Sequence, residues 1–275
     1  MPPKLNVRNL AETTLPFAWF QAVTDVLEQG REFEIDKGSF DGRDRMGNRV
    51  EGEMQTRLEF DYFSQHIWMP GVRPLAPEFP ENFPIEPPTT DDKIDNYLSY
   101  VMTDYKAPNE DYTYGERMVK PKIRLWENPK TNELYWEKTP EHKEQRVIQI
   151  GPSSIDHVIK TYTDYGHRNN QMIMQVGMPS DIILDDPPCL RHIDTRVQDD
   201  YLHFIVYFRS WDLWNGYPEN LGGIQLLKEY MASEIGVNDG EMIVSSKGLH
   251  LYGYAVELAE LRTMAKAKQR LRENQ

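Results

Sequence analysis

Seven of the 19 prolines lie between Pro70 and Pro88, and this clustering limits the fold more than any other feature of the sequence. A proline fixes its own φ angle and removes a backbone donor, so regular structure cannot persist through such a segment. We therefore expect an irregular excursion over about residues 64–90. This excursion is a lid or an oligomer arm, or else a solvated linker. The regular helices and strands must then precede and follow it in the sequence.

Before this excursion, the sequence predicts one helix and one strand. Residues 16–30 carry an apolar stripe of helical period, with Pro16 in the first turn, Thr14 as a candidate cap and Gly30 as a stop. The stripe consists of Phe17, Phe20, Val23 and Leu27. Residues 49–63 alternate between apolar and polar side chains, which is typical of a half-buried strand. The apolar side of that strand consists of Val50, Met54, Leu58, Phe60 and Tyr62.

Beyond the excursion, helices and strands alternate. Residues 91–105 have a helical apolar period, and residues 121–138 indicate a hairpin. Short apolar runs at 171–178 and 201–208 are typical of strands buried in a sheet. Further helices are expected at 153–166, 220–236 and 254–275, with a strand at 241–246. The sequence has no glycine-rich phosphate loop, so the dinucleotide and P-loop fingerprints are absent.

The 275-residue chain is acidic, with 31 Lys and Arg against 44 Asp and Glu and a formal net charge of -13. Such a charge repels nucleic acid, so a general DNA- or RNA-binding function is disfavoured. A small phosphorylated ligand stays compatible, because a few convergent arginines can bind it. We expect no membrane span, no signal peptide and a cytoplasmic location. The single cysteine allows no intramolecular disulfide and no four-cysteine zinc site, and we expect no metal.

That cysteine, Cys189, follows two prolines and precedes a strand-like alternation in the stretch DDPPCLRHIDTRV. A lone cysteine beside apolar residues is usually an inert packing residue. It acts as a nucleophile only where its surroundings favour the thiolate. The residues that accompany it must therefore decide between the two interpretations.

A second stretch, residues 207–220, combines groups that suit a phosphate and a pyrimidine. Arg209 and Ser210 end an apolar strand and can hold a phosphate by charge-assisted hydrogen bonds. Asp212 lies just beyond them, and the amide of Asn220 both donates and accepts, as a pyrimidine edge requires. The alternative is a strand end, a turn and an Asn helix cap, which fits each residue taken singly.

His250 and Tyr252 lie two residues apart on a predicted strand, hence on one face, where they can bind a sugar hydroxyl. In isolation, an ordinary pair on an edge strand explains them better. Together, however, PPCL, FRSWD, GYPEN and HLY resemble, in order and spacing, the thymidylate synthase family. The forms YTYGERM, RSWDLWNG and SKGLHLY are most similar to its archaeal-type branch. The resemblance is clear over about residues 112–260 and weaker over 16–63.

This resemblance implies an α+β fold with a large, mostly mixed β-sheet flanked by helices, in a single domain over residues 1–275. It implies a homodimer whose sheets stack back to back, with which the apolar runs at 171–176 and 201–208 agree. It also implies transfer of a one-carbon unit from methylene-tetrahydrofolate, or a related reduced pterin, to carbon 5 of dUMP, which gives dTMP. The partners are then a pyrimidine nucleotide and a second copy of the chain, without nucleic acid, membrane or metal.

The resemblance also implies a role for each residue of the motifs. Cys189 matches the nucleophile that adds to carbon 6 of uracil, and Arg209, if it lies beside the thiol, would lower the thiol pKa and bind the phosphate. The other matches are Ser210 as a phosphate ligand, Asp212 at the base and pterin side, Asn220 as the selector of uracil, His250 and Tyr252 at the sugar 3'-hydroxyl, and Tyr114 in a catalytic water network.

Two matches lie outside these motifs. Arg45, with Arg43 as a competing choice, resembles a mobile phosphate arginine. Arg168 resembles the first of two paired arginines that reach the phosphate in the other subunit, although Asn169 replaces the second.

The sequence also departs from the family pattern at three points. Leu190 follows the cysteine where bacterial and animal enzymes carry histidine. Only 25 residues follow His250, so we expect the long closing tail of better-known members to be missing. The glutamate that assists proton transfer in the family has no clear counterpart in this sequence. The candidates are Glu81, Glu86 and Glu110.

Two alternative functions remain open from the sequence. If water rather than hydride captures the methylene, the product is a 5-hydroxymethyl pyrimidine nucleotide, and the missing tail leaves water exclusion undecided. In the second alternative, the chain is a nucleotide-binding or scaffold protein on the same fold with catalysis lost, because a fold alone does not guarantee activity. Cys189→Ser separates these classes, since only an enzyme should lose turnover while still holding nucleotide.

Overall fold

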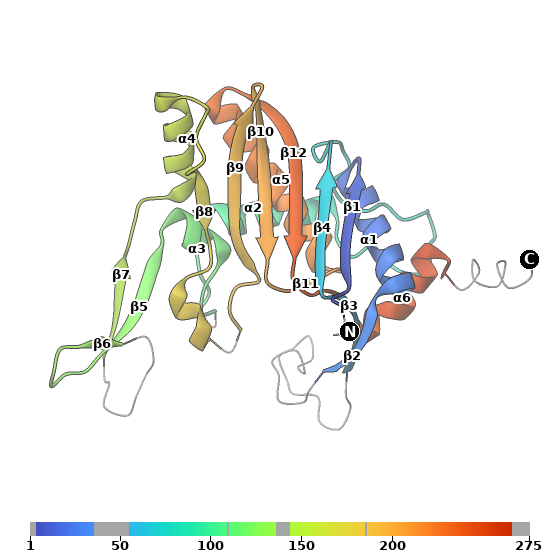
Figure 1. Ribbon diagram of the computed structural model, residues 1–275, viewed down its shortest axis with the longest axis horizontal. Coiled ribbons are helices and arrows are strands. Elements are labelled where there is room, and N and C mark those ends of the chain that lie inside the picture. The colour runs from blue at the N-terminus through green and yellow to red at the C-terminus, as the bar shows by residue number, and fades with distance from the viewer. Residues whose placement is uncertain (1–3, 36–54, 109, 136–143, 185, 266–275) are drawn as a thin grey trace, which may run out of the picture.

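The computed structural model describes residues 4–35, 55–108, 110–135, 144–184 and 186–265. Its largest sheet has six strands in the order β1-β4-β12-β10-β9-β8 (Figure 1). The sheet is mixed, because β1 is parallel to β4 and β10 to β12, whereas the other neighbours are antiparallel. Its strands are β1 Val7–Glu12, β4 Tyr62–Ile67, β8 Ile173–Gln175, β9 Leu190–Gln198, β10 Tyr201–Phe208 and β12 Asn238–Ser246.

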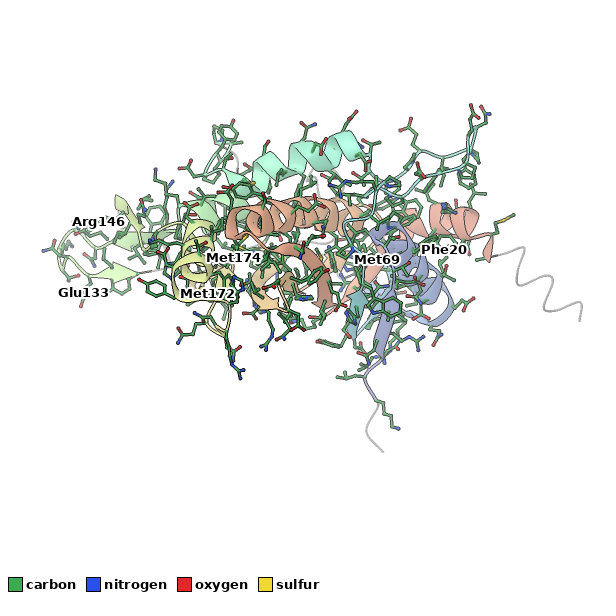
Figure 2. The ribbon with its side chains drawn as sticks, turned by 90° about the horizontal axis from the view of Figure 1, so that it is seen from above. Phe20, Met69, Glu133, Arg146, Met172 and Met174 are labelled. Carbon is green, nitrogen blue, oxygen red and sulfur yellow. The ribbon has the colours of Figure 1, made fainter. Side chains whose placement is uncertain are left out.

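Two smaller sheets adjoin the large one. The four-stranded sheet has the order β11-β13-β3-β2, with β11 Trp211–Asp212, β13 Leu249–Tyr252, β3 Gln55–Phe60 and β2 Arg31–Ile35. The three-stranded sheet consists of β6 Leu134–Tyr135, β5 Lys122–Glu127 and β7 Glu144–Gln149. It projects as an arm, whose outer end Glu133 and Arg146 mark in Figure 2. The expected hairpin is confirmed as β5 and β6, whereas β7 was not predicted.

Six α-helices lie within the described residues: α1 Leu15–Gln29, α2 Asp91–Met102, α3 Tyr114–Val119, α4 Ser154–Tyr165, α5 Gly216–Ile235 and α6 Gly253–Thr263. Seen from above, α5 lies along the large sheet and α2 lies on the outer side of α5 (Figure 2). The expected α+β fold, with a large mixed sheet flanked by helices, is confirmed.

The core lies between the large sheet and the helices. In β10, Leu202, Phe204, Val206 and Phe208 point toward the helices and are buried, which follows from the two-residue period of a strand. Burying each such side chain contributes about 2 kcal/mol. This packing makes the ends of β9 and β10 rigid supports for the loops that follow them.

The expectation of one strand over 49–63 is wrong, because the chain bends at Asp61. The Asp61 carboxylate accepts a hydrogen bond from the backbone nitrogen of Asn6 at 2.6 Å. β3 before the bend and β4 after it belong to different sheets. The alternation therefore changes phase, so that Phe63 is buried while Tyr62, expected inside, is 38% exposed. Of the other apolar positions expected there, Phe60 is buried, Leu58 packs against the core, and Val50 and Met54 lie outside the described residues.

The first helix is confirmed, and its expected stripe is confirmed in part, because Val23 is buried and Phe20 and Leu27 pack against the core. Phe17 is 62% exposed, whereas Trp19 is completely buried. The indole nitrogen of Trp19 donates to the carbonyl of Leu213 at 2.9 Å, and this bond sets the rotation of the helix. Thr14 is the N-cap residue but its side chain makes no capping bond. The buried residues of α1 are Leu15, Ala18, Trp19, Ala22, Val23 and Val26.

Two later helices differ from expectation at their ends. α5 begins at Gly216, four residues before the expected start at Asn220, because Pro218 is well placed in a first turn. α6 is described to Thr263, and residues 266–275 lie outside the described part of the chain.

The proline-rich segment is irregular as expected, but it begins later and is not a solvated linker. Residues 64–67 still belong to β4. Leu75 is 2% exposed within the core, and the ring of Phe79 lies 6.2 Å from that of Trp19. Arg73 forms two hydrogen bonds with the carboxylate of Glu229 on α5, at 2.7 and 2.8 Å. The side chains of this segment therefore pack against the rest of the fold, and the backbone nitrogen of Ala76 donates to Asp91 on α2.

The face of the large sheet that points away from the helices is exposed and partly apolar. Ile205 and Ile243 are direct neighbours on β10 and β12, and Ile173 lies in the same row across β9. Their exposed fractions lie between 37% and 41%. In the described ranges, no helix is long and apolar enough to cross a bilayer.

Candidate active site

Cys189 is held at the start of β9, beside the end of β10. The backbone nitrogen of Arg209 donates to the carbonyl of Cys189 at 2.8 Å, and the next pair in the register is Leu190 with Phe208. Cys189 is half-buried and packs against the core. The antiparallel pairing of two apolar strands therefore makes Cys189 and Arg209 backbone neighbours at one end of the sheet.

The Arg209 guanidinium reaches around the loop that carries the thiol. Its Nε donates to the carbonyl of Pro187 at 3.0 Å, and its Nη2 donates to Asp186 at 3.1 Å. The side chain is 31% exposed and that of Asp186 is 42% exposed. At such exposure an ion pair contributes at most about 1 kcal/mol, so an incoming anion can compete for the guanidinium.

Tyrosines cover the other side of this loop. The hydroxyl of Tyr114, at the start of α3, accepts a hydrogen bond from the backbone nitrogen of Leu190 at 3.3 Å. The ring of Tyr112 stacks at 6.5 Å from it, and that of Tyr100 lies 6.1 Å away edge-on. Burial, and then the nearby charge of Cys189, raise the pKa of the Tyr114 hydroxyl far above its ordinary value. Burial also raises the pKa of Tyr100 to about 12. These hydroxyls are therefore neutral donors at physiological pH.

Asp212 organises the turn between β10 and α5. Its carboxylate accepts from the backbone nitrogen of Trp214 at 2.9 Å and from that of Asn215 at 3.4 Å. Ser210 lies just before it and is half-buried. Asp212 pairs in register with His250, so β11 and β13 bring the motifs that contain these two residues together.

His250 and Tyr252 share one face of β13, as expected from their spacing. Nδ1 of His250 lies 2.9 Å from the carbonyl of Gly248, which makes Nδ1 the protonated nitrogen. The two rings meet edge-on at 4.6 Å. His250 is buried whereas Tyr252 is half-buried, so the pair leads from the core toward the surface.

Asn220 lies in the first turns of α5 with both ends of its amide engaged. Its Oδ1 accepts from the indole nitrogen of Trp211 at 3.1 Å, and its Nδ2 donates to the hydroxyl of Tyr97 at 2.9 Å. Trp211 stacks on Phe208 at 4.0 Å, next to the strand end that pairs with Leu190. Asn220 is thus connected through packed rings to the loop of Cys189.

Comparison with known proteins now decides the family. The profile described as "Thymidylate synthase" matches residues 114–273, which is more than half of the chain. The chain belongs to the thymidylate synthase family. The matched span contains Cys189, Arg209, Asn220 and His250, and the family expected from the motifs is therefore confirmed.

Named relatives agree with this family. A "Putative thymidylate synthase" of Methanococcoides burtonii is 26% identical over 163 residues, which cover 59% of this chain and 63% of that protein. One from Methanothermobacter marburgensis is 20% identical over 252 residues, or 92% of this chain and 94% of that protein. The "Thymidylate synthase" of Listeria monocytogenes serovar 1/2a is 28% identical over 181 residues, covering 60% and 56%. The first and third matches thus span less than two thirds of those proteins.

Not every residue expected at a thymidylate synthase site lies near Cys189. Arg168 is exposed between α4 and β8, near Gln198 at the far end of β9. At about 3.3 Å per residue, the length of β9 alone separates it from Cys189 by roughly 25 Å. Arg45 and its competitor Arg43 lie outside the described residues.

The structure also distinguishes the three candidate glutamates. The charge of Glu110 contributes to the raised pKa of Tyr100, and its carboxylate accepts a hydrogen bond from the backbone nitrogen of Ala107 at 2.8 Å. Glu81 and Glu86 are exposed in the proline-rich segment. A fourth glutamate that the sequence did not suggest, Glu219, precedes Asn220 and has a pKa raised by burial.

The sequence analysis missed the aromatic partners of the site. Tyr97 lies 123 residues before Asn220 and reaches it only because α2 packs on α5. Trp211 lies inside the motif FRSWD, but its position in the sequence is equally that of an ordinary buried core residue. Tyr112 is the first residue of the motif YTYGERM, but the sequence analysis assigned a role only to Tyr114.

Proposed function

We propose that this protein transfers a one-carbon unit to carbon 5 of dUMP through a covalent adduct of Cys189 and releases dTMP. The observation that supports this most strongly is the pairing of Cys189 with Arg209 through their backbones. A cation beside a thiol favours the thiolate, which is the nucleophilic form. Family membership, with the distant relatives named above, supports the same class of reaction.

In the proposed reaction, the sulfur of Cys189 bonds to carbon 6 of the uracil. The π pair of the C5–C6 bond moves to carbon 5 and is delocalised toward the carbonyl at carbon 4, where hydrogen-bond donors stabilise the developing charge. Carbon 5 then bonds to the one-carbon unit and loses its proton to a base. The bond from the one-carbon unit to the pterin nitrogen would then break to leave an exocyclic methylene on carbon 5. Hydride from the reduced pterin would add to that methylene, and the sulfur would leave carbon 6 as the C5–C6 double bond forms again.

The remaining residues of the site would bind the nucleotide. Arg209 exchanges Asp186 for the phosphate, and Ser210 adds a hydroxyl donor. Asn220 faces the base, and His250 with Tyr252 binds the sugar hydroxyl. Methylene-tetrahydrofolate or a related reduced pterin would supply both the carbon and the hydride. Tyr114, held on Leu190, keeps the nucleophile's loop in position for this addition.

We also propose a homodimer formed through the exposed face of the six-stranded sheet. The row of Ile173, Ile205 and Ile243 supports it, because such contiguous apolar surface is unusual on a face left in water. A twofold axis there would stack the two sheets back to back. Ile205→Asp should therefore yield a monomer in sedimentation velocity, while Ile150→Asp on the projecting arm should leave the dimer intact.

The dimer would give Arg168 a purpose that one chain does not explain. If it reaches the phosphate in the partner subunit, Cys189→Ser and Arg168→Ala protomers should complement each other. Random mixing puts one complete site in half of the dimers, which restores about a quarter of the wild-type activity. Mixtures that stay as inactive as the separate variants would contradict this assignment.

The reaction is tested by the mass of the nucleotide after incubation with dUMP and methylene-tetrahydrofolate. The gain of one CH2 unit is expected, because it requires both the carbon and the hydride. A gain of CH2O would mean that water captures the methylene, so that the enzyme is a hydroxymethylase. Unchanged nucleotide with dUMP, UMP, CMP and dCMP, and with other reduced pterins, would contradict catalysis altogether.

A further inference from the structure

We propose that Trp211, with support from Tyr97, is the positioning residue that makes this site prefer uracil to cytosine. It does so by holding the side-chain amide of Asn220 in one orientation. The inference rests on the proposed function, because it assumes that Asn220 faces the base. It adds two residues that neither touch the reacting atoms nor belong to the expected set of site residues.

Trp211 determines which end of the amide points where. Its indole nitrogen is only a donor, so the atom 3.1 Å away must be Oδ1 of Asn220. The indole itself has no freedom to turn, because it is 2% exposed and stacked between Phe208 at 4.0 Å and Tyr217 at 4.5 Å. If the amide of Asn220 were reversed, its N–H group would face the indole N–H of Trp211, and both donors would lack an acceptor.

Tyr97 completes the clamp from the opposite helix. Its hydroxyl accepts from Nδ2 of Asn220 at 2.9 Å, and burial keeps this hydroxyl protonated by raising its pKa well above the ordinary value. The ring reaches this place because α5 carries Gly223, where an added Cβ would lie 2.3 Å from Cδ1 of Tyr97. A hydroxyl can donate as well as accept, so Tyr97 alone does not fix the orientation.

The clamp leaves half of each amide group for a ligand. An amide nitrogen carries two hydrogens and an amide oxygen has two lone pairs, so one donor and one acceptor remain. Uracil offers an acceptor at O4 to the remaining N–H of this amide, and a donor at N3 to its oxygen. Cytosine offers a donor at N4 and an acceptor at N3, which matches only the reversed amide. Because Trp211 excludes the reversed amide, cytosine would leave polar groups unpaired.

The two residues should therefore behave differently when changed. Trp211→Phe removes the donor that forbids reversal, so the amide can serve either base. Tyr97→Phe removes one acceptor but keeps the stacked ring, which lies 5.5 Å from Tyr100. That change should weaken the binding of both nucleotides equally, because Trp211 still fixes the orientation of the Asn220 amide. A general loss of packing would also weaken both alike, so only the ratio of affinities reports positioning.

The test is calorimetric titration of the full-length protein with dUMP and with dCMP, without a one-carbon donor. We expect Trp211→Phe to reduce the preference for dUMP by about 10-fold, and Tyr97→Phe to weaken both ligands while keeping the ratio. If Trp211→Phe does not fold, benzothienylalanine at position 211 keeps the ring shape and removes only the N–H donor.

Each outcome bears on the inference. An unchanged ratio in the variant at position 211, or equal binding of dUMP and dCMP by the wild type, overturns it while leaving the proposed reaction standing. If the wild type binds neither nucleotide, the proposed function fails and the inference fails with it. A lowered ratio at position 211, with a constant ratio at position 97, supports it.

Discussion

The two ends of the six-stranded sheet differ in their chemistry although the same strands build both. We call the end with Cys189 and Arg209 the thiol end. The opposite end, where β9 ends and β10 and β12 begin, is called the acidic end. It contains a cavity of about 710 Å³, whose lining includes Asp199, Glu229, Asp239 and Glu241.

The comparison teaches that the charge around a site, and not the size of a cavity alone, indicates where a phosphorylated ligand would bind. Four carboxylates around the acidic end would repel a phosphate, whereas Arg209 at the thiol end is held only by a partly exposed ion pair. Lys228, which pairs with the lining residue Asp239, is 0% exposed, and its ammonium group is engaged by Asp239 and two backbone carbonyls. The acidic end therefore contributes to stability, whereas the proposed binding and chemistry belong to the thiol end.

The largest effect is expected from Cys189→Ser. Serine is a far weaker nucleophile at neutral pH, so turnover should fall by about 10³-fold or more. Affinity for dUMP should change by less than about 3-fold, because the base and phosphate contacts remain. The measurement is steady-state turnover together with equilibrium binding. Equal loss of binding and turnover would break the separation between chemistry and binding at this end.

Lys228→Met should give the largest loss of stability, at the acidic end. Removing the buried ammonium group leaves two backbone carbonyls and the 30%-exposed carboxylate of Asp239 without this donor, which costs about 1–3 kcal/mol. Urea unfolding measures this, with Lys160→Met as control because Lys160 is 70% exposed. Nucleotide affinity of the folded Lys228→Met protein should stay unchanged. A variant as stable as the wild type would remove the contrast between the two ends.

Arg209→Gln should lower the affinity for dUMP by about 10- to 100-fold, because a charge-assisted hydrogen bond to the phosphate is lost. The matched control is Arg73→Gln at the acidic end, where the arginine pairs with Glu229 at 2.7 Å. That change should leave nucleotide affinity within about 2-fold of the wild type. If both variants lose affinity equally, the phosphate is not bound specifically at the thiol end.

The smallest effect concerns pH. Burial raises the pKa of Tyr114 in the folded protein above its unfolded value of about 10. Its contribution to stability is therefore complete below pH 10 and lost as pH rises further, because only the unfolded chain then releases the proton. Tyr114→Phe should make the decline above pH 10 shallower by about 1.4 kcal/mol per pH unit in urea unfolding. Identical slopes would show that this hydroxyl is not sequestered.

The thiol end was more predictable from sequence than the bends of the chain. Its residues occur in short contiguous motifs at strand ends, and neighbouring strand ends bring Cys189 and Arg209 together. The bend at Asp61 was not predictable, because it depends on a bond to Asn6, 55 residues away. Tyr97 was missed for the same reason, since only the packing of α2 on α5 brings it to Asn220.

The central claim is that Cys189 attacks the pyrimidine, and trapping the adduct tests it most directly. In 5-fluoro-dUMP, the fluorine at carbon 5 cannot leave as a proton does, so the covalent adduct should persist in the presence of methylene-tetrahydrofolate. Mass spectrometry of the digested protein should find nucleotide and folate on the peptide that contains Cys189, and none in Cys189→Ser. Binding of the nucleotide without any adduct, or an adduct on another residue, would contradict the account.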